Sequence, residues 1–202
     1  MEEIKTKFKN AVVLTGSIAT GKSSVAKIVK SLGYEIVDAD MISHGVLDGK
    51  IRAIIDLFGE RFVKENKVDR KALGELVFND KDKLSLLEEL LHPAIKEQIY
   101  KKAEELDKKG ELFFVEIPLF FESGDYFDLG MVAVVYVSEE IQLQRLMKRN
   151  NLDLETAKKR ANLQLSIEKK KSLADYIIDN SGSLEALKDE VLGLIERLNF
   201  KC

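Results

Sequence analysis

The chain has 202 residues, of which 45% are hydrophobic and 33% charged, a composition typical of a soluble globular protein and not of a disordered or fibrous one. This length favours one compact domain with an inserted subdomain, and the net charge of −3 argues against general binding to nucleic acids or anionic membranes. The only cysteine, Cys202, excludes an internal disulfide framework and a cysteine-based zinc cluster, and fits a reducing compartment. Since no apolar stretch approaches the roughly 20 residues that span a bilayer, and the first ten residues do not resemble a signal peptide, we expect a cytoplasmic protein.

The first predicted elements are a strand at residues 11–15, a glycine-containing loop and a helix whose apolar residues recur from Val25 to Leu32. The loop reads Gly16-Ser17-Ile18-Ala19-Thr20-Gly21-Lys22-Ser23 and matches the phosphate-binding pattern G-x-x-x-x-G-K-[ST]. Backbone N–H groups and the positive end of the helix dipole suit a triphosphate, Lys22 adds a formal charge, and Ser23 can bind Mg²⁺. A strand before this pattern and a helix after it make it a specific signal for a nucleotide-binding P-loop.

Two aspartates follow the second predicted strand, at residues 34–37. Asp38 and Asp40 are two positions apart, so both are expected on one side of the chain at the P-loop edge of the sheet. Either could accept a proton from an attacking hydroxyl or support bound magnesium, or could cap the following helix. We favour function for Asp40 more strongly than for Asp38.

Residues 41–106 have a helical pattern, in which His92-Pro93 is expected to divide two helices because proline is well tolerated at a first helical position. The His-Pro pair is more typical of structure than of catalysis, and the sequence offers no nucleophile for the histidine to activate.

Residues 112–117 and 131–137 are predicted to be buried parallel strands, since both are short, apolar and rich in β-branched and aromatic side chains. Glu116 ends the first of them, where it could help to hold magnesium through water or could simply end the strand. Helices are predicted from Ser138, an N-cap, to about residue 148 and from Asp153 onward.

The segment 141–171 carries nine basic residues against three acidic ones. Such a surplus favours a segment that closes over polyphosphate, although single lysines are better explained as solvated charges. For at least one of Arg145, Arg149 and Arg160 we favour a functional role. A short strand at 176–178 and an amphipathic helix at 184–198 complete an α/β fold around a parallel sheet.

The order of these motifs resembles the dephospho-CoA kinase family, which phosphorylates the ribose 3′-hydroxyl of dephospho-CoA in the last step of coenzyme A synthesis. The resemblance covers nearly the whole chain and is more specific than the P-loop alone. The motifs that carry it are Leu14-Thr15-Gly16 with the P-loop, 37–40 (VDAD), 91–93 (LHP), 117–122 (IPLFFE), 142–149 (QLQRLMKR), 160–164 (RANLQ) and 174–180 (ADYIIDN).

The resemblance implies a P-loop kinase sandwich with a five-stranded parallel sheet, a helical acceptor-binding subdomain at about 41–106 and a mobile lid at about 141–171. It implies ATP and Mg²⁺ as cofactors, dephospho-CoA as the small-molecule partner, Asp40 as catalytic base, and Lys22 and Arg145 as stabilisers of the γ-phosphate. The remaining residues expected to bind nucleotide are Gly16, Ser17, Ile18, Ala19, Thr20, Gly21, Ser23, Ser24, Arg149 and Arg160. Acceptor binding is expected at Asp38, Asp40, His92 and Pro93.

The loop departs from the usual family pattern at three positions. Ser17 and Ala19 stand where the family usually has glycine, and Ser24 stands where it usually has threonine. These changes bear on the geometry of the loop and on nucleotide affinity.

Two other functions remain open from the sequence. A nucleotide or sugar kinase would share the same core, and a P-loop switch would bind nucleotide in order to recruit a protein. The absence of an Asn-Lys-x-Asp guanine signature, together with the basic segment and Asp40, favours transfer to an acceptor over a switch.

Overall fold

The computed structural model describes residues 6–199, so Cys202 and the first five residues lie outside the described part. The chain divides into two compact units, at Val37/Asp38 and again at Lys102/Ala103. The first unit combines both ends of the described chain, and the second is the segment 38–102.

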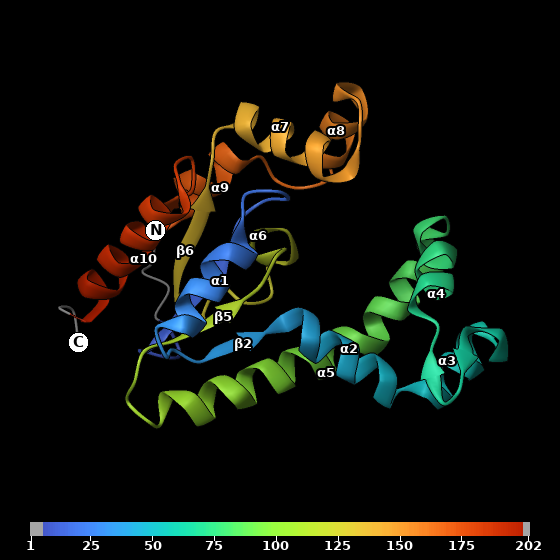
Figure 1. The fold of residues 1–202 in the computed structure, drawn as a ribbon. Helices are drawn as coiled ribbons and strands as arrows, with labels where there is room; N and C mark the ends of the chain where they lie inside the picture. Colours follow the sequence, from blue (N-terminus) through green and yellow to red (C-terminus); the bar gives the residue numbers. More distant parts are fainter. Residues whose placement is uncertain (1–5, 200–202) are drawn as a thin grey trace. The chain divides into compact units, whose positions relative to one another are not determined.

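The first unit is built on a five-stranded sheet in the order β2-β5-β1-β6-β7 (Figure 1). The strands are β1 (Ala11–Thr15), β2 (Ile36–Asp38), β5 (Phe113–Glu116), β6 (Met131–Tyr136) and β7 (Tyr176–Asp179). β1 pairs in parallel with β5 and β6, and β6 with β7, in registers such as Val13 opposite Val115 and Val132. The predicted α/β fold with a five-stranded parallel sheet is confirmed, although β2 begins two residues later than expected.

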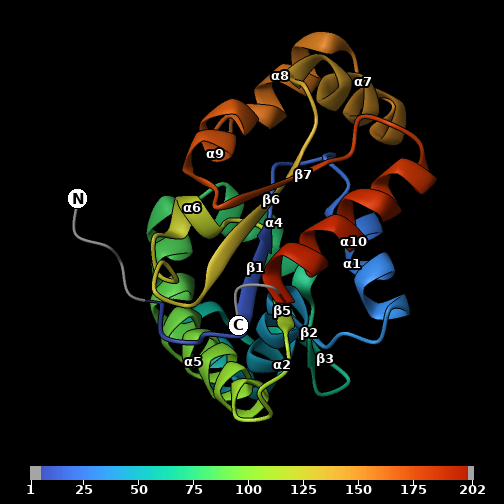
Figure 2. The same ribbon diagram turned by 90° about the vertical axis from the view of Figure 1, so that its left-hand side faces the viewer.

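The central strands are buried on both faces, which explains why their sequences are continuous apolar runs. On one face, α1 (Lys22–Ser31) and α10 (Leu184–Asn199) pack together over the strands (Figure 2). The helix α10 is amphipathic as predicted, and its buried residues are Leu187, Val191, Leu194, Ile195 and Leu198. Helix α1 ends before Gly33, which has φ 90° just after the C-cap Leu32.

Three helices follow β6 and precede β7. They are α7 (Glu139–Asn150), α8 (Leu154–Ala161) and α9 (Ile167–Leu173). The predicted N-cap at Ser138 is confirmed, because its side chain accepts a hydrogen bond from the Ile141 amide. Asp153, where the next helix was predicted to start, is the N-cap of α8 and accepts a hydrogen bond from the Thr156 amide. A short α6 (Phe120–Ser123) follows β5, where Phe120 is buried against the rings of Phe121 and Phe127.

The second unit is mainly helical, with α2 (Ala39–Gly49), α3 (Ile51–Phe58), the 3₁₀ turn η1 (Glu60–Phe62) and α4 (Arg70–Phe78). It also contains an antiparallel hairpin, β3 (Val63–Lys64) with β4 (Lys67–Val68), which the helical pattern did not predict. The turn places Glu65 and Asn66 at positive φ, and two-residue strands leave too little alternation to detect in a sequence.

The predicted break at His92-Pro93 is wrong. Helix α5 runs without interruption from Lys81 to Asp107, with Pro93 inside it. Proline removes one backbone hydrogen bond, but Leu91, Ile95 and Ile99 are buried on both sides of it, so burial of the apolar stripe maintains the helix through this position.

None of the helices formed by residues 6–199 combines the length and the apolar character that crossing a membrane requires.

Candidate nucleotide site

The P-loop joins the carboxyl end of β1 to the first turn of α1, the strand-loop-helix context that its sequence predicted. Its two pattern glycines are needed for different contacts. A Cβ on Gly16 would lie 2.7 Å from the Val135 carbonyl oxygen, and a Cβ on Gly21 would lie 2.0 Å from the Asn180 side-chain nitrogen. Gly21 also has φ 98°, a conformation that L side chains rarely adopt. Only glycine therefore lets this loop lie so close to β6 and to the residue after β7.

Two of the three departures from the family pattern, Ala19 and Ser17, have different structural consequences. Ala19 has φ 63°, so it occupies the left-handed region that a glycine would enter without strain. Ser17 is 1% exposed, and its hydroxyl donates to the Leu165 carbonyl at 3.2 Å. The serine therefore adds a contact between the P-loop and the connection from α8 to α9 that a glycine could not make.

Lys22 and Ser23 lie in the first turn of α1, where their roles in phosphate and metal binding were predicted. The Lys22 ammonium donates to the carbonyl oxygens of Gly16 at 3.0 Å and Ser17 at 3.3 Å, which holds its charge over the loop. Ser23 is exposed and Ser24 is partly buried. The α1 amino terminus, the ammonium and an accessible hydroxyl thus converge where a triphosphate with Mg²⁺ would need them.

Arg145 is held at the P-loop by Asn180. Its guanidinium donates to the Asn180 carbonyl oxygen at 2.8 Å, and the Asn180 side-chain amide donates to the Thr20 carbonyl at 2.7 Å. Arg145 is partly buried. Two hydrogen bonds therefore connect the predicted charge stabiliser to the loop.

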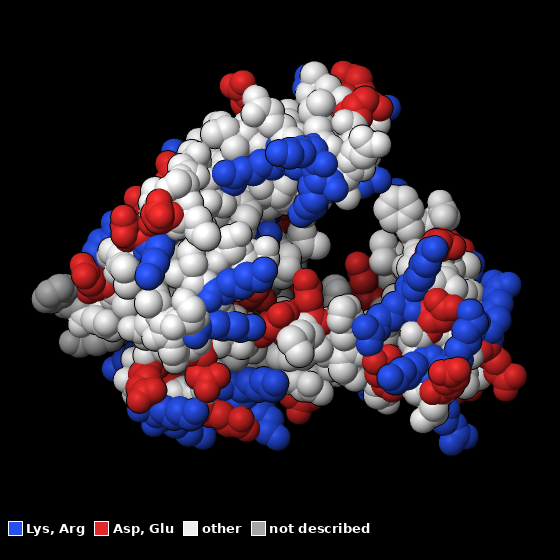
Figure 3. All heavy atoms as spheres, viewed as in Figure 1, with Lys and Arg blue, Asp and Glu red and all other residues white. Residues whose placement is uncertain are grey.

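Arg149 and Arg160 differ from Arg145. Both are exposed, and Arg149 donates to the side chain of its neighbour Asn150. Lysine and arginine side chains gather over the α7 and α8 region in the upper part of the face shown in Figure 3. The basic surplus predicted for 141–171 is therefore largely on the surface.

Amide side chains that the sequence analysis left without a role bind the P-loop backbone. Gln164 accepts a hydrogen bond from the Ile18 amide at 2.7 Å, and Gln142 donates to the Ile18 carbonyl at 2.9 Å. Gln142 is 3% exposed and lies four residues before the buried Leu146 on α7. A polar residue on the apolar stripe of a helix signals a buried partner, but the sequence could not identify that partner as the P-loop.

Lys170 contradicts the expectation that the lysines of this segment are solvated. Its side chain is 0% exposed, and its ammonium lies 2.8 Å from the carboxylate of Glu122, whose side chain is 22% exposed. The approach is not aligned as a hydrogen bond, so the attraction is mainly electrostatic. Lys170 lies one helical turn after the buried Ile167, and this spacing was the only sequence signal for its burial.

Two pKa shifts arise from hydrogen bonds made by helices of the α7–α9 segment. The pKa of Tyr136 is raised above its usual range, first because its hydroxyl donates to Glu168 at 2.7 Å and then because of burial. The pKa of Asp153 is lowered, because the backbone N–H and then the hydroxyl of Thr156 donate to its carboxylate. Tyr136 connects β6 to α9 through Glu168, and Asp153 caps the first turn of α8.

The remaining candidate residues are Glu116 at the end of β5 and four residues of the second unit. Glu116 is the last residue of β5 and is partly buried, paired in register with Leu14. In the second unit, Asp38 caps α2 by accepting from the Met41 amide at 3.0 Å, whereas Asp40 is exposed in the first turn of the same helix. His92 and Pro93 are exposed on α5.

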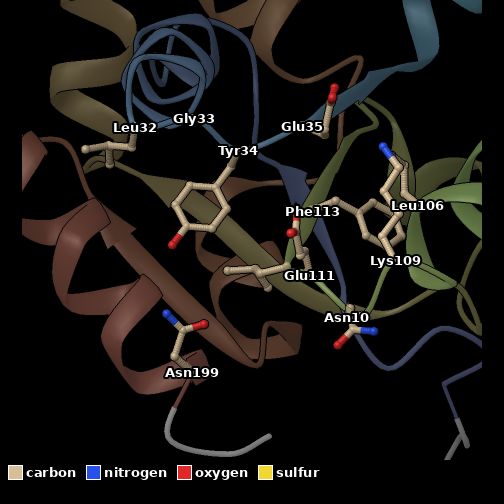
Figure 4. Close-up of a pocket in the computed structure, with 12 residues that line it drawn as sticks. Asn10, Leu32, Gly33, Tyr34, Glu35, Leu106, Lys109, Glu111, Phe113 and Asn199 are labelled. Atoms are coloured by element: carbon tan, nitrogen blue, oxygen red, sulfur yellow. The ribbon is translucent and has the colours of Figure 1, made fainter.

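A pocket of about 370 Å³ in the first unit lies at the other end of the sheet (Figure 4). Its lining includes Asn10, Glu35 and Leu112, and each of these residues directly precedes the first residue of a strand. Figure 4 shows Tyr34 and Asn199 on its wall as well. Because the P-loop follows the carboxyl end of β1, this pocket is not part of the nucleotide site.

Comparisons with known proteins agree on one family. A family model described as dephospho-CoA kinase matches residues 10–186. A dephospho-CoA kinase of Wolinella succinogenes is 41% identical over 189 residues, which cover 93% of this chain and 94% of the relative. The solved dephospho-CoA kinase from Campylobacter jejuni is 40% identical, with a TM-score of 0.71, over 94% of this chain and 97% of its own. A shikimate kinase from Acinetobacter baumannii shares the fold, with 18% identity and a TM-score of 0.53 over 95% of this chain and 94% of its own.

Proposed function

The chain belongs to the dephospho-CoA kinase family and is a phosphotransferase, and on that premise we propose that it uses ATP to phosphorylate the ribose 3′-hydroxyl of dephospho-CoA. The observation that carries this proposal is the family match over residues 10–186. The P-loop geometry supports it, since Lys22 binds the loop carbonyls and Arg145 binds Asn180 beside the loop. The products are ADP and coenzyme A, the last step of coenzyme A synthesis in this family.

Charge stabilisation is the main task of the P-loop residues. The transferring phosphoryl group is surrounded by negative oxygens, so catalysis depends on positioning and on preorganised positive charge. Lys22 and Arg145 supply formal charges, and the loop from Gly16 to Ser24 supplies backbone donors and the helix amino terminus. Arg149 and Arg160, both exposed, are proposed as further nucleotide contacts.

Asp40 is the proposed general base. The ribose hydroxyl must lose a proton as it attacks the γ-phosphorus, and a carboxylate within hydrogen-bond reach accepts that proton. Asp38 already accepts a backbone hydrogen bond as the α2 cap, which makes it the less suitable base of the two. The unit 38–102, with His92 and Pro93, is the proposed acceptor-binding subdomain, and 141–171 is the proposed lid.

Magnesium is part of the proposal as the partner of the triphosphate. The donor set fits this ion, since Mg²⁺ keeps several waters and uses few protein oxygens besides phosphates. The exposed Ser23 hydroxyl would bind it directly, and Glu116 would hold it through water. When bound, the ion neutralises charge on the β- and γ-phosphates. A cytoplasmic location, with no nucleic-acid or membrane partner, completes the proposal.

A panel of acceptors in an ADP-release assay tests this function against its rivals. We expect dephospho-CoA to raise ADP production far above the rate without acceptor, while nucleotides and sugars do not. Strong stimulation by another acceptor alone would assign the chain a different substrate. Acceptor-independent hydrolysis that depends on a protein partner would favour the switch.

A further inference from the structure

The peptide group of Leu165 is fixed from both sides. Its N–H donates to the Glu122 carboxylate at 2.9 Å, and its carbonyl oxygen accepts the Ser17 hydroxyl at 3.2 Å. Leu165 lies in the connection between α8 and α9, whereas Glu122 lies in α6 and Ser17 in the P-loop. Three segments far apart in the sequence therefore meet at a single peptide.

Glu122 holds this peptide and a buried charge with the same oxygen. Its Oε1 atom accepts the Leu165 N–H and also forms the ion pair with Lys170 at 2.8 Å. Since the Lys170 side chain is 0% exposed, its charge depends on this carboxylate, and the pair fixes the Glu122 side chain in turn. The Lys170 charge thus acts on the P-loop through Glu122 and Leu165.

Gln164, the residue before Leu165, also fixes the backbone of the P-loop. Gln164 accepts the Ile18 amide at 2.7 Å, so Gln164 and Leu165 together bind two consecutive P-loop residues. The next residue, Ala19, has φ 63°, a strained conformation for a residue with a side chain. Contacts that fix the loop in this conformation therefore offset the strain at Ala19.

We propose that Glu122 and Lys170 are positioning residues of the nucleotide site, which hold Gln164 and Leu165 against the P-loop and thereby set the affinity for ATP. We call this set the P-loop clasp: Ser17, Glu122, Gln164, Leu165 and Lys170. The inference rests on the ATP site proposed above. It assigns the buried pair a role in ordering the loop before nucleotide binds, which reduces the entropy lost on binding.

The experiment compares ATP affinity, turnover and stability in the full chain. Lys170→Met removes the charge but keeps an unbranched side chain, and Glu122→Gln removes the opposite charge. The double variant removes both charges. Lys169→Met is the matched control, because Lys169 is an exposed neighbour on α9. Titration calorimetry with ATP and Mg²⁺ gives Kd, steady-state assays give KM and kcat, and thermal melts report folding.

Each single variant should raise Kd and KM for ATP about tenfold, within the usual range of coupling between linked sites, with kcat at saturating ATP changed less than about threefold. The effects should be non-additive. The Kd of the double variant for ATP should therefore rise less than the product of the two single-variant increases in Kd. Lys169→Met should match the wild type.

Three results would overturn the clasp. One is a lower Tm with unchanged Kd for ATP, which is what a purely structural pair would give. The others are an equal rise in Kd for Lys169→Met and strictly additive effects of the two changes.

Ser17→Gly provides a second route if loss of the buried pair prevents folding, since glycine is the usual family residue there. It removes only the hydroxyl contact with Leu165 and should raise Kd for ATP about threefold, with faster amide exchange in a peptide that covers residues 162–169. Wild-type affinity in this variant would refute the proposal. Failure of the wild type itself to bind ATP would instead refute the proposed function.

Discussion

At the P-loop, Lys22 and Arg145 are already held by protein contacts, whereas three of the four predicted acceptor residues, Asp40, His92 and Pro93, are exposed. Arg145 is bound by Asn180, and Lys22 by the loop carbonyls. Asp40 and His92, in contrast, are accessible to solvent. The comparison indicates that the proposed charge-stabilising groups are preorganised, while these proposed acceptor residues are accessible. Substitutions in the two regions should therefore have different consequences.

The largest effect is expected at Asp40, the only proposed proton acceptor. Asp40→Asn keeps the shape and a polar oxygen but removes the base, so kcat should fall by roughly 10²- to 10⁴-fold while ATP binding, measured by calorimetry, is retained. Asp56→Asn, an exposed carboxylate on α3, is the control for the change in charge. Weaker ATP affinity only in the presence of magnesium would assign Asp40 to the metal, and near wild-type turnover would exclude it as the base.

Arg145→Ala should be next, with kcat lowered by about 10²-fold or more because a preorganised charge at the transferring group is lost. Since the guanidinium also bonds Asn180, stability should fall by about 1 kcal/mol, measured by denaturant unfolding. Lys148→Ala changes an exposed charge on the same helix and should have little effect. An Arg145 variant with near-normal kcat would show that this arginine serves the fold alone.

Gly21→Ala tests how tightly the loop is enclosed. The added Cβ would meet Asn180 at 2.0 Å and would be strained at φ 98°, so we expect a loss of about 1–3 kcal/mol in stability and weaker ATP binding. Gly33→Ala is a matched control, because φ is 90° there and nothing lies within 4 Å of the new Cβ. If both variants lose the same stability and keep ATP affinity, the contact with Asn180 has no role in nucleotide binding.

The smallest effect is expected from Asp153, the cap of α8, whose pKa is lowered by hydrogen bonds from Thr156. A lowered folded-state pKa contributes stability above the unfolded value of about 3.9, and that stability is lost as pH falls through the folded pKa. Asp153→Ala should cause a small decrease in Tm at pH 7, and the difference should shrink below about pH 4. A difference that is independent of pH would mean that the charge of Asp153 does not stabilise the fold.

The sequence predicted the sheet and the P-loop well, because continuous apolar strands and a glycine loop before a helix have strong local signatures. It failed at Pro93, where burial on both sides maintains the helix, and at the hairpin 63–68, whose strands are too short for a visible period. The sequence could not predict the P-loop clasp for a different reason. Glu122 and Lys170 are 48 positions apart, and only the fold shows that a lysine in a basic segment is buried against that carboxylate.

The most direct test of the account is the position of the new phosphate in the product formed from ATP and dephospho-CoA. Phosphorus NMR and mass spectrometry of the purified product should show one added phosphoryl group on the ribose 3′-oxygen, in an amount equal to the ADP released. A phosphate at any other position, or ADP released without a phosphorylated acceptor, would contradict the account.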